Sequence, residues 1–379
     1  MSGYAVGDVL RVARRVGNPK RTYLLVNPLQ AKHMPVRPSR ALAMMQALGS
    51  QLAEKYPDTG LIVGFAETAT AIGAAVASCF GAGCRYMHTT RESLGQEQDW
   101  ILFLEEHSHA MEQRLHRGGF LQGLNPEGTV IFVEDEISTG RTLLNMLRQL
   151  RGVSEAASKV RMVAASIINR LSEENERLLR EAGIECEYLV KLPEEDYAAQ
   201  VDGWPVAPAE DMTACSADAA CTRLDGPAGY PNPRLGADFA AYHAHCQRVA
   251  DQAAAQLSAC VKPGMRLLVL GTEECMYPAL VVGAELEKLV DGQVYCHATT
   301  RSPIGVWDAA DYPIRSGYRI RSFYEMERVT FLYNLDGYDA VVIVTDAAPG
   351  ATDAVSVLAA ALGRHGACPI YDVRCGERV

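Results

Sequence analysis

Short apolar runs alternate with longer amphipathic stretches between residues 20 and 192. The apolar runs, each rich in β-branched residues and bounded by glycine or polar turns, lie at residues 61–64, 130–133 and 160–167. Continuous apolar runs of this length are typical of parallel strands that are buried on both faces. Stretches with helical periodicity lie at residues 40–55, 70–80, 141–150 and 173–182. This strand–helix alternation predicts an α/β domain with a doubly wound parallel sheet over residues 1–193.

Residues 194–236 lose this periodicity, and residues 237–379 resume it. The intervening stretch contains several prolines among alanine, aspartate and glycine, so we interpret it as a mostly irregular linker. The last region repeats motifs of the first, in the same order and at similar spacing: 61–68 matches 267–274, 88–93 matches 297–302, and 130–135 matches 341–346. Three ordered matches predict a second, diverged α/β domain of similar pattern.

A motif with a polar end follows the apolar run at 130–133. An acidic pair ends the predicted strand, a turn of small residues comes next and a helix then begins; the residues are Glu134, Asp135, Ser138, Thr139, Gly140, Arg141 and Thr142. Ligands of open α/β sheets bind beyond the carboxyl ends of strands, and a helix N-terminus favours an anion. Carboxylates suit ribose hydroxyls or Mg²⁺, so the motif predicts a ribose 5-phosphate site. An ordinary strand–turn–helix unit with solvated acids is the alternative.

Residues 134–142 and the strand before them resemble the signature of type I phosphoribosyltransferases, which binds phosphoribosyl pyrophosphate (PRPP). That signature has an acidic pair, two mainly apolar residues and then small-small-Gly-x-Thr. Here Glu136 replaces the first apolar residue, a departure that offers the site a further carboxylate. The resemblance implies that residues 138–142 hold the 5′-phosphate. It also implies that Glu134 and Asp135 bind the ribose hydroxyls or, directly or indirectly, Mg²⁺.

The resemblance also assigns the pyrophosphate half of the site. In this family the first strand–helix turn holds pyrophosphate, largely through backbone N–H groups, and here that turn comprises Gly64, Phe65, Ala66, Glu67 and Thr68. Arg91 is expected to neutralise pyrophosphate charge as the glycosidic bond breaks, and His107 or His109 to act as acid or base. The alternatives are a plain turn at 64–68, and a histidine pair that binds metal or lies on the surface.

Two further groups of residues are candidates for substrate contacts. Lys32 and His33 lie in a basic, proline-flanked segment that is expected to form part of the hood over the acceptor; a surface turn is the alternative. The second copy keeps Asp346 but loses the acidic pair, while arginines are dense between residues 301 and 328. Such density suits an anionic ligand or a contact over the first site, and a solvated or domain-packing face is the alternative. The candidates there are Thr300, Arg301, Ser302 and Arg328.

A narrower resemblance covers nearly the whole chain. The segments at 32–35, 105–110 and 134–136, together with Thr-Arg-Ser-Pro at 300–303, are similar to orotate-phosphoribosyltransferase-like proteins encoded in bacterial tellurium-resistance gene clusters. In that family the C-terminal domain is named TRSP after its motif. The resemblance implies a role in the biosynthesis of a nucleoside-like metabolite.

Composition narrows the range of partners. The formal net charge of −10 argues against a nucleic-acid or membrane surface partner, since both need a basic face. The first residues lack a signal-peptide pattern, no apolar run is long enough to span a bilayer, and eleven scattered cysteines indicate reduced thiols, so we expect a cytoplasmic protein. Related enzymes commonly dimerise, and a homodimer is therefore expected.

Together these features predict a Mg²⁺-dependent phosphoribosyltransferase. It would move ribose 5-phosphate from PRPP to a base-like small molecule and release pyrophosphate. Two alternatives stay open at this point: a non-catalytic sensor that binds PRPP or a nucleotide, and an enzyme that cleaves a nucleotide in the reverse sense.

Overall fold

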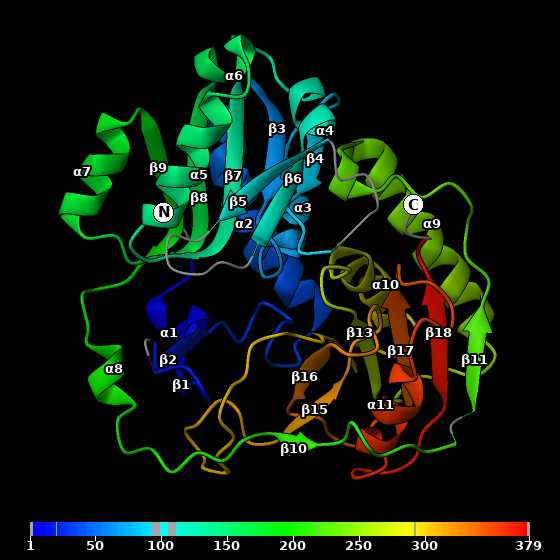
Figure 1. The fold of residues 1–379 in the computed structure, drawn as a ribbon. Helices are drawn as coiled ribbons and strands as arrows, with labels where there is room; N and C mark the ends of the chain where they lie inside the picture. Colours follow the sequence, from blue (N-terminus) through cyan, green and yellow to red (C-terminus); the bar gives the residue numbers. More distant parts are fainter. Residues whose placement is uncertain are drawn as a thin grey trace.

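The chain forms two α/β domains, each built on its own sheet (Figure 1). This computed structural model describes residues 3–19, 21–92, 99–104, 111–218, 220–291 and 293–376. The predicted doubly wound α/β domain and the second, diverged α/β domain are both confirmed by the sheet topology.

The first domain has a six-stranded sheet in the order β12–β4–β3–β7–β8–β9. Every neighbouring pair is parallel except β12–β4. Its strands are β3 (Thr59–Gly64), β4 (Arg85–His88), β7 (Thr129–Ile137), β8 (Arg161–Asn169), β9 (Ile184–Lys191) and β12 (Ala237–Asp238). Its helices are α2 (Pro38–Lys55), α3 (Thr70–Ala77), α4 (Arg117–Gln122), α5 (Arg141–Arg151), α6 (Glu155–Lys159) and α7 (Glu173–Glu181). The helices expected from periodicity are therefore present, with small changes at their ends.

The second domain has a five-stranded, fully parallel sheet in the order β11–β18–β17–β13–β14. Its strands are β11 (Cys221–Leu224), β13 (Leu267–Gly271), β14 (Val294–Ala298), β17 (Ala340–Thr345) and β18 (Ile370–Arg374). Its helices are α9 (Phe239–Leu257), α10 (Tyr277–Glu287) and α11 (Ala354–Leu362). A hairpin of β15 (Gly317–Arg321) and β16 (Val329–Tyr333) lies beside it.

Four helices pack together between the two sheets. Helix α2 buries Ala41, Met44, Leu48 and Leu52, a helical spacing that gives one apolar face. The same continuous hydrophobic cluster includes residues of α3, α9, α10, β3 and β13. The domains therefore share a core, and separating them would expose apolar surface. Among the described residues, no helix is long and apolar enough to cross a membrane.

The chain between the domains contains several short elements (Figure 1). These elements are α8 (Tyr197–Gln200), β10 (Glu210–Asp211), β11 and the 3₁₀ helix η2 (Pro233–Leu235). Strand β10 pairs with β15, and β11 pairs with β18. The sequence pattern gave no sign of these strands, because a short segment can join a sheet edge through backbone hydrogen bonds alone.

The N-terminal segment covers part of both domains. It contains α1 (Val6–Val9) and the antiparallel pair β1 (Arg11–Arg14) and β2 (Tyr23–Val26). Ala13, Leu24 and Val26 pack in one cluster with Ile304 and Tyr333 of the second domain. The remaining pair, β5 (Trp100–Leu104) and β6 (Met111–His116), is an antiparallel hairpin of the first domain.

Strand registers establish which residues of the two domains are equivalent. Gly64 lies opposite His88 and Val133 in the first sheet, and Gly271 lies opposite Ala298 and Val344 in the second. Thr89–Thr90–Arg91 therefore corresponds to Thr299–Thr300–Arg301, and Asp135 corresponds to Asp346. The two histidines that precede these threonine pairs are offset by one position.

Candidate active site

Strand β7 extends beyond its neighbour β3, and this overhang carries the acidic pair. Pairing of β3 with β7 ends at Gly64 and Val133, whereas pairing of β7 with β8 continues to Ile137 and Asn169. The turn after β3 folds back against the overhang, where the Thr68 Oγ1 hydroxyl donates to Asp135 Oδ1 at 3.0 Å. The structure thus joins the predicted pyrophosphate turn to the predicted ribose acids.

The pKa values of the two half-buried acids, Glu134 and Asp135, are both raised. Burial raises the pKa of Glu134 well above its usual range, the Asp135 carboxylate raises it further, and the positive charge of Arg91 opposes this. Burial and the Glu136 carboxylate likewise raise the pKa of Asp135. Glu134 and Asp135 therefore form a site with excess negative charge, which favours a cation or hydrogen-bond donors.

Among the described residues, the Glu136 carboxylate, unlike those of Glu134 and Asp135, forms ion pairs with two arginines. Its Oε2 accepts from the Arg21 guanidinium at 2.8 Å, and its Oε1 accepts from Arg170 at 3.0 Å. Both arginines also lie over the ring of Tyr23, at 5.2 and 5.3 Å from its centroid. The charge at this unusual signature position therefore links the N-terminal β2 to the end of β8.

The turn before α5 leaves the helix N-terminus open to an anion. Gly140 takes the left-handed conformation, with φ of 70°, and no side chain caps the helix. The first turn of α5 contains no acidic residue, and Thr139 and Thr142 are exposed with Ser138 half-buried beside them. Unpaired N–H groups and three hydroxyls therefore surround one point at the carboxyl end of β7.

A cavity of about 720 Å³ adjoins this turn. Ser138 and Thr139 line it on one side, and Arg21, Tyr23 and Arg170 line it on another. The cavity therefore borders both the predicted phosphate turn and an aromatic ring flanked by guanidinium groups, a combination of apolar and polar lining that is typical of small-molecule sites.

The backbone N–H groups of residues 65–68, in the predicted pyrophosphate turn, differ in whether they have a hydrogen-bond acceptor. The N–H of Phe65 donates to the Val133 carbonyl at 3.0 Å, and that of Ala66 donates to Thr89 Oγ1 at 2.8 Å. The N–H groups of Glu67 and Thr68 have no acceptor among the described residues. These two donors are available to an anion at the end of β3.

The Glu67 side chain points away from that anion position into the contact between the domains. Its carboxylate pairs with the fully buried Lys32 ammonium, and it accepts from Thr300 Oγ1 at 3.1 Å and from the Arg301 N–H at 3.2 Å. Burial alone would raise the pKa of Glu67, but Lys32 and Arg301 lower it overall. Glu67 is therefore an ionised, charge-matched group.

The remaining first-domain candidates differ in their surroundings. The Arg91 side chain is exposed, and its backbone N–H donates to Glu274 Oε1 at 2.8 Å. His33 is buried next to Lys32, and burial lowers its pKa well below the ordinary value. A role of Lys32 and His33 in covering the acceptor stays a prediction. His107 and His109 lie outside the described residues.

The second-domain candidates meet carboxylates from both domains. The Arg301 guanidinium pairs with Glu92, with Glu273 at 2.8 Å and with Glu67 at 3.4 Å. Arg328 pairs with Glu273 at 3.0 Å and also with Glu92. Ser302 contributes its carbonyl, which accepts from a tyrosine hydroxyl at 2.7 Å. Sequence reasoning named Glu67 but missed Glu92 and Glu273; a signal for the latter was the pair Glu273–Glu274, which follows β13 as Glu67 follows β3.

The equivalent place in the second domain is filled by its own side chains. Asp346 pairs with the buried Arg234 and accepts from the Tyr324 hydroxyl at 2.6 Å. Arg234 also pairs with Glu274 at 2.8 Å. This corner is therefore closed, whereas its first-domain counterpart is open.

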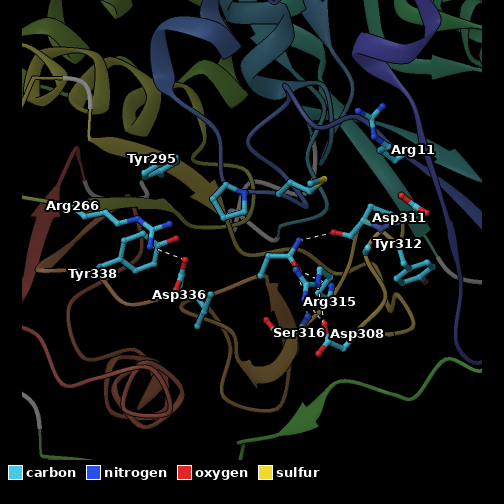
Figure 2. A pocket seen from close by; sticks show the side chains of 16 residues that line it. Arg11, Arg266, Tyr295, Asp308, Asp311, Tyr312, Arg315, Ser316, Asp336 and Tyr338 are labelled. Carbon is cyan, nitrogen blue, oxygen red and sulfur yellow. Dashed lines mark hydrogen bonds and ion pairs between the residues drawn. The ribbon is translucent and has the colours of Figure 1, made fainter.

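Figure 2 shows a different cavity, of about 660 Å³. Arg266, Tyr295 and Tyr338 line it at the amino ends of the second-domain strands. Arginines that line this cavity form ion pairs with aspartates that also line it: Arg266 pairs with Asp336 at 2.7 Å, and Arg315 pairs with Asp308 at 2.6 Å. The carboxyl ends of parallel strands are the usual ligand positions, so this cavity lies apart from the candidate site.

Comparison with known proteins agrees with this geometry. Residues 9–193 match a family model described as phosphoribosyl transferase, and residues 232–362 match one described as the TRSP domain C-terminal to that transferase. No curated protein matches the chain.

Similar solved structures include three phosphoribosyltransferases. The adenine enzyme of Leishmania tarentolae is 17% identical, with 49% of this chain and 85% of that chain covered and a TM-score of 0.34. The adenine enzyme of Trypanosoma brucei, in complex with AMP, pyrophosphate and ribose 5-phosphate, is 15% identical, with 49% and 79% covered and a TM-score of 0.36. The orotate enzyme of Aeropyrum pernix is 16% identical, with 49% and 89% covered and a TM-score of 0.31.

The two family models fall on the two α/β domains in the expected order. Sequence motifs and family models thus lead to the same assignment. The chain belongs to the phosphoribosyl transferase family that carries a C-terminal TRSP domain, and it is an enzyme of the phosphoribosyltransferase class.

Proposed function

We propose that this enzyme transfers ribose 5-phosphate from PRPP to a base-like small molecule and releases pyrophosphate. The observation that carries the proposal is the Thr68–Asp135 hydrogen bond of 3.0 Å, which joins the turn after β3 to the acids at the end of β7. PRPP has a phosphate, a ribose diol and a pyrophosphate, and the three adjoining elements offer partners for each.

Each element would have a distinct task. The hydroxyls and N–H groups of residues 138–142 would bind the 5′-phosphate, and Glu134 and Asp135 the ribose hydroxyls. The N–H groups of Glu67 and Thr68, with the exposed Arg91 guanidinium, would stabilise the charge that develops on the departing pyrophosphate. Holding PRPP and acceptor side by side supplies the remaining catalytic advantage. His107 or His109 as acid or base stays part of the proposal.

The acid pair also fits Mg²⁺. This ion keeps several waters and binds through one or two carboxylates together with substrate phosphates, so it needs no protein cage. Glu134 and Asp135 are half-buried carboxylates whose pKa values are raised by burial and by a neighbouring carboxylate, more than Arg91 and Arg21 lower them. When bound, Mg²⁺ would neutralise phosphate charge on PRPP.

The cavity beside Ser138 and Thr139 is the proposed acceptor site. Tyr23 offers an aromatic face, and Arg21 and Arg170 offer N–H donors at its edge. A nucleoside-like product, a homodimeric assembly and a cytoplasmic location are predictions of the sequence that we retain.

Calorimetric titration with PRPP and Mg²⁺ tests the proposal. Asp135→Asn removes one acceptor for a ribose hydroxyl or metal, and we expect binding to weaken by about 10-fold or more, because hydrogen bonds to charged groups contribute about 1.5–3 kcal/mol. Asp353→Asn is the matched control, since Asp353 precedes α11, the counterpart of α5, in the second domain. Equal affinity of the wild type and Asp135→Asn would refute the assignment. Product analysis with nucleoside monophosphates and pyrophosphate then tests the reverse direction.

A further inference from the structure

The two domains exchange the same hydrogen bonds in both directions. The Thr90 hydroxyl of the first domain donates to Glu274 of the second at 2.7 Å, and the Thr300 hydroxyl of the second donates to Glu67 of the first at 3.1 Å. The N–H of the following arginine repeats this, from Arg91 to Glu274 at 2.8 Å and from Arg301 to Glu67 at 3.2 Å. Each domain therefore holds the first strand–helix turn of the other.

Backbone pairing follows the same two-fold pattern. Ala237, just before α9, pairs with Tyr86 on β4, the outermost strand that the first domain itself contributes to its sheet. Val36, just before α2, pairs with Cys296 on the edge strand of the second sheet. Tyr86 and Cys296 are equivalent by strand register. The contacts between the two domains therefore have approximate two-fold symmetry, as if the second domain were a rotated copy of the first.

The contacts from the second domain fall on one half of the proposed site. Arg301 and Arg328 both pair with Glu92, next to Arg91, and Arg301 also reaches Glu67 in the turn after β3. In the described part of the chain, residues 138–142 make no hydrogen bond or ion pair with residues 237–376. Among the described segments assigned to PRPP, the two assigned to pyrophosphate are therefore held across the domain boundary, and residues 138–142 are not.

Because these contacts hold the turn after β3, the N–H groups of Glu67 and Thr68 would keep a fixed position. Glu67 has its carboxylate fixed by Lys32, Thr300 and Arg301, and its own N–H is one of the two that remain available to an anion. Loosening the carboxylate would let this peptide group move. A displacement of about 1 Å at a binding group is enough to lower activity by about 100-fold.

We propose that Thr300 and Arg301 are positioning residues, through which the second domain fixes the pyrophosphate half of the active site. The inference rests on the proposed function. It assigns the TRSP domain the role of a built-in second subunit that contacts neither ribose nor 5′-phosphate.

The test compares the two halves of PRPP as separate ligands. Thr300→Val keeps the shape of the side chain and removes its hydrogen bond to Glu67, together with the one that it accepts from the Ser302 N–H. We expect calorimetric affinity for pyrophosphate to fall by about 5- to 10-fold, affinity for ribose 5-phosphate to stay within about 2-fold, and KM for PRPP to rise more than kcat falls. Thr300→Ser restores the hydroxyl and is expected to restore pyrophosphate affinity.

Thr345→Val is the matched control. It removes a buried hydroxyl of the second domain that accepts from Thr272 at 2.7 Å, away from the contacts with Glu67. This variant should lose stability without losing pyrophosphate affinity. The inference is overturned if Thr300→Val binds pyrophosphate like the wild type, if both half-ligands weaken together, or if Thr345→Val reproduces the selective loss. A wild type that binds neither half-ligand would overturn the proposed function as well, so the two failures are distinct.

Discussion

Gly140 occupies a constrained position in the turn before α5, the proposed phosphate site, and its replacement by alanine tests the geometry of that turn. Its φ of 70° lies where a Cβ atom is disfavoured. A Cβ there would also come within 2.9 Å of Leu171 Cδ2 and 3.0 Å of Leu179 Cδ1. Both leucines are buried in the core cluster that supports α5, so they have little room to move.

The magnitude follows from two separate costs. The left-handed conformation costs an alanine roughly 1–2 kcal/mol. Forcing an extra carbon into a packed site costs typically about 1–3 kcal/mol. Gly140→Ala should therefore lower the free energy of unfolding by about 2–5 kcal/mol, or else the turn shifts and its anion site is lost.

Gly350 provides the matched control. It has a φ of 69° and lies in the loop before α11, the counterpart of α5, but a Cβ there would meet no atom within 4 Å. Gly350→Ala should therefore show only the conformational cost of roughly 1–2 kcal/mol. Urea denaturation measures both variants, and calorimetry with ribose 5-phosphate measures the anion site. If Gly140→Ala were no less stable than Gly350→Ala and bound ribose 5-phosphate normally, the described turn would be wrong.

Two further predictions concern the acid at position 135 and its counterpart. Because burial and Glu136 raise the pKa of Asp135, the folded chain holds its proton to higher pH than the unfolded chain, and ionisation above that range destabilises the fold. Thermal melts of Asp135→Asn without ligand should therefore show a higher midpoint at neutral pH, a gain that disappears below the ordinary pKa of about 3.9. Since Arg234 and Tyr324 fill the corner around Asp346, calorimetry should give one PRPP per chain, and two equal sites would contradict the closed geometry.

Local patterns predicted the parallel strands and the turn before α5 correctly. Apolar runs mark β3 and the first half of β7 because both are buried on two faces. The same rule misses the polar end of β7, where Glu134, Asp135 and Glu136 continue the strand with β8 as a neighbour. The overhang that carries the proposed site is therefore the part of the strand that hydrophobicity does not reveal.

Contacts between distant segments were beyond sequence reasoning. The arginines at 301 and 328 left an anionic ligand, a contact over the first site and a domain-packing face all open, because nothing local showed that Glu92 and Glu273 would neutralise them. Likewise, the basic segment with Lys32 gave no sign that its ammonium would be buried against Glu67. A buried cation is stable only with a partner, and the partner's identity depends on the fold.

The geometry explains how one copy of a repeated unit can lose its site and keep its interface. The interface groups follow β3 and β4 in the first domain and β13 and β14 in the second. The phosphate turn instead follows β7 and precedes α5, on the neighbouring strand. Substitutions that fill the space around Asp346 with side chains therefore need not disturb Thr300 or Arg301. A second domain without an open site of its own can still hold Glu67, and the Thr300→Val comparison measures how much the first domain depends on it.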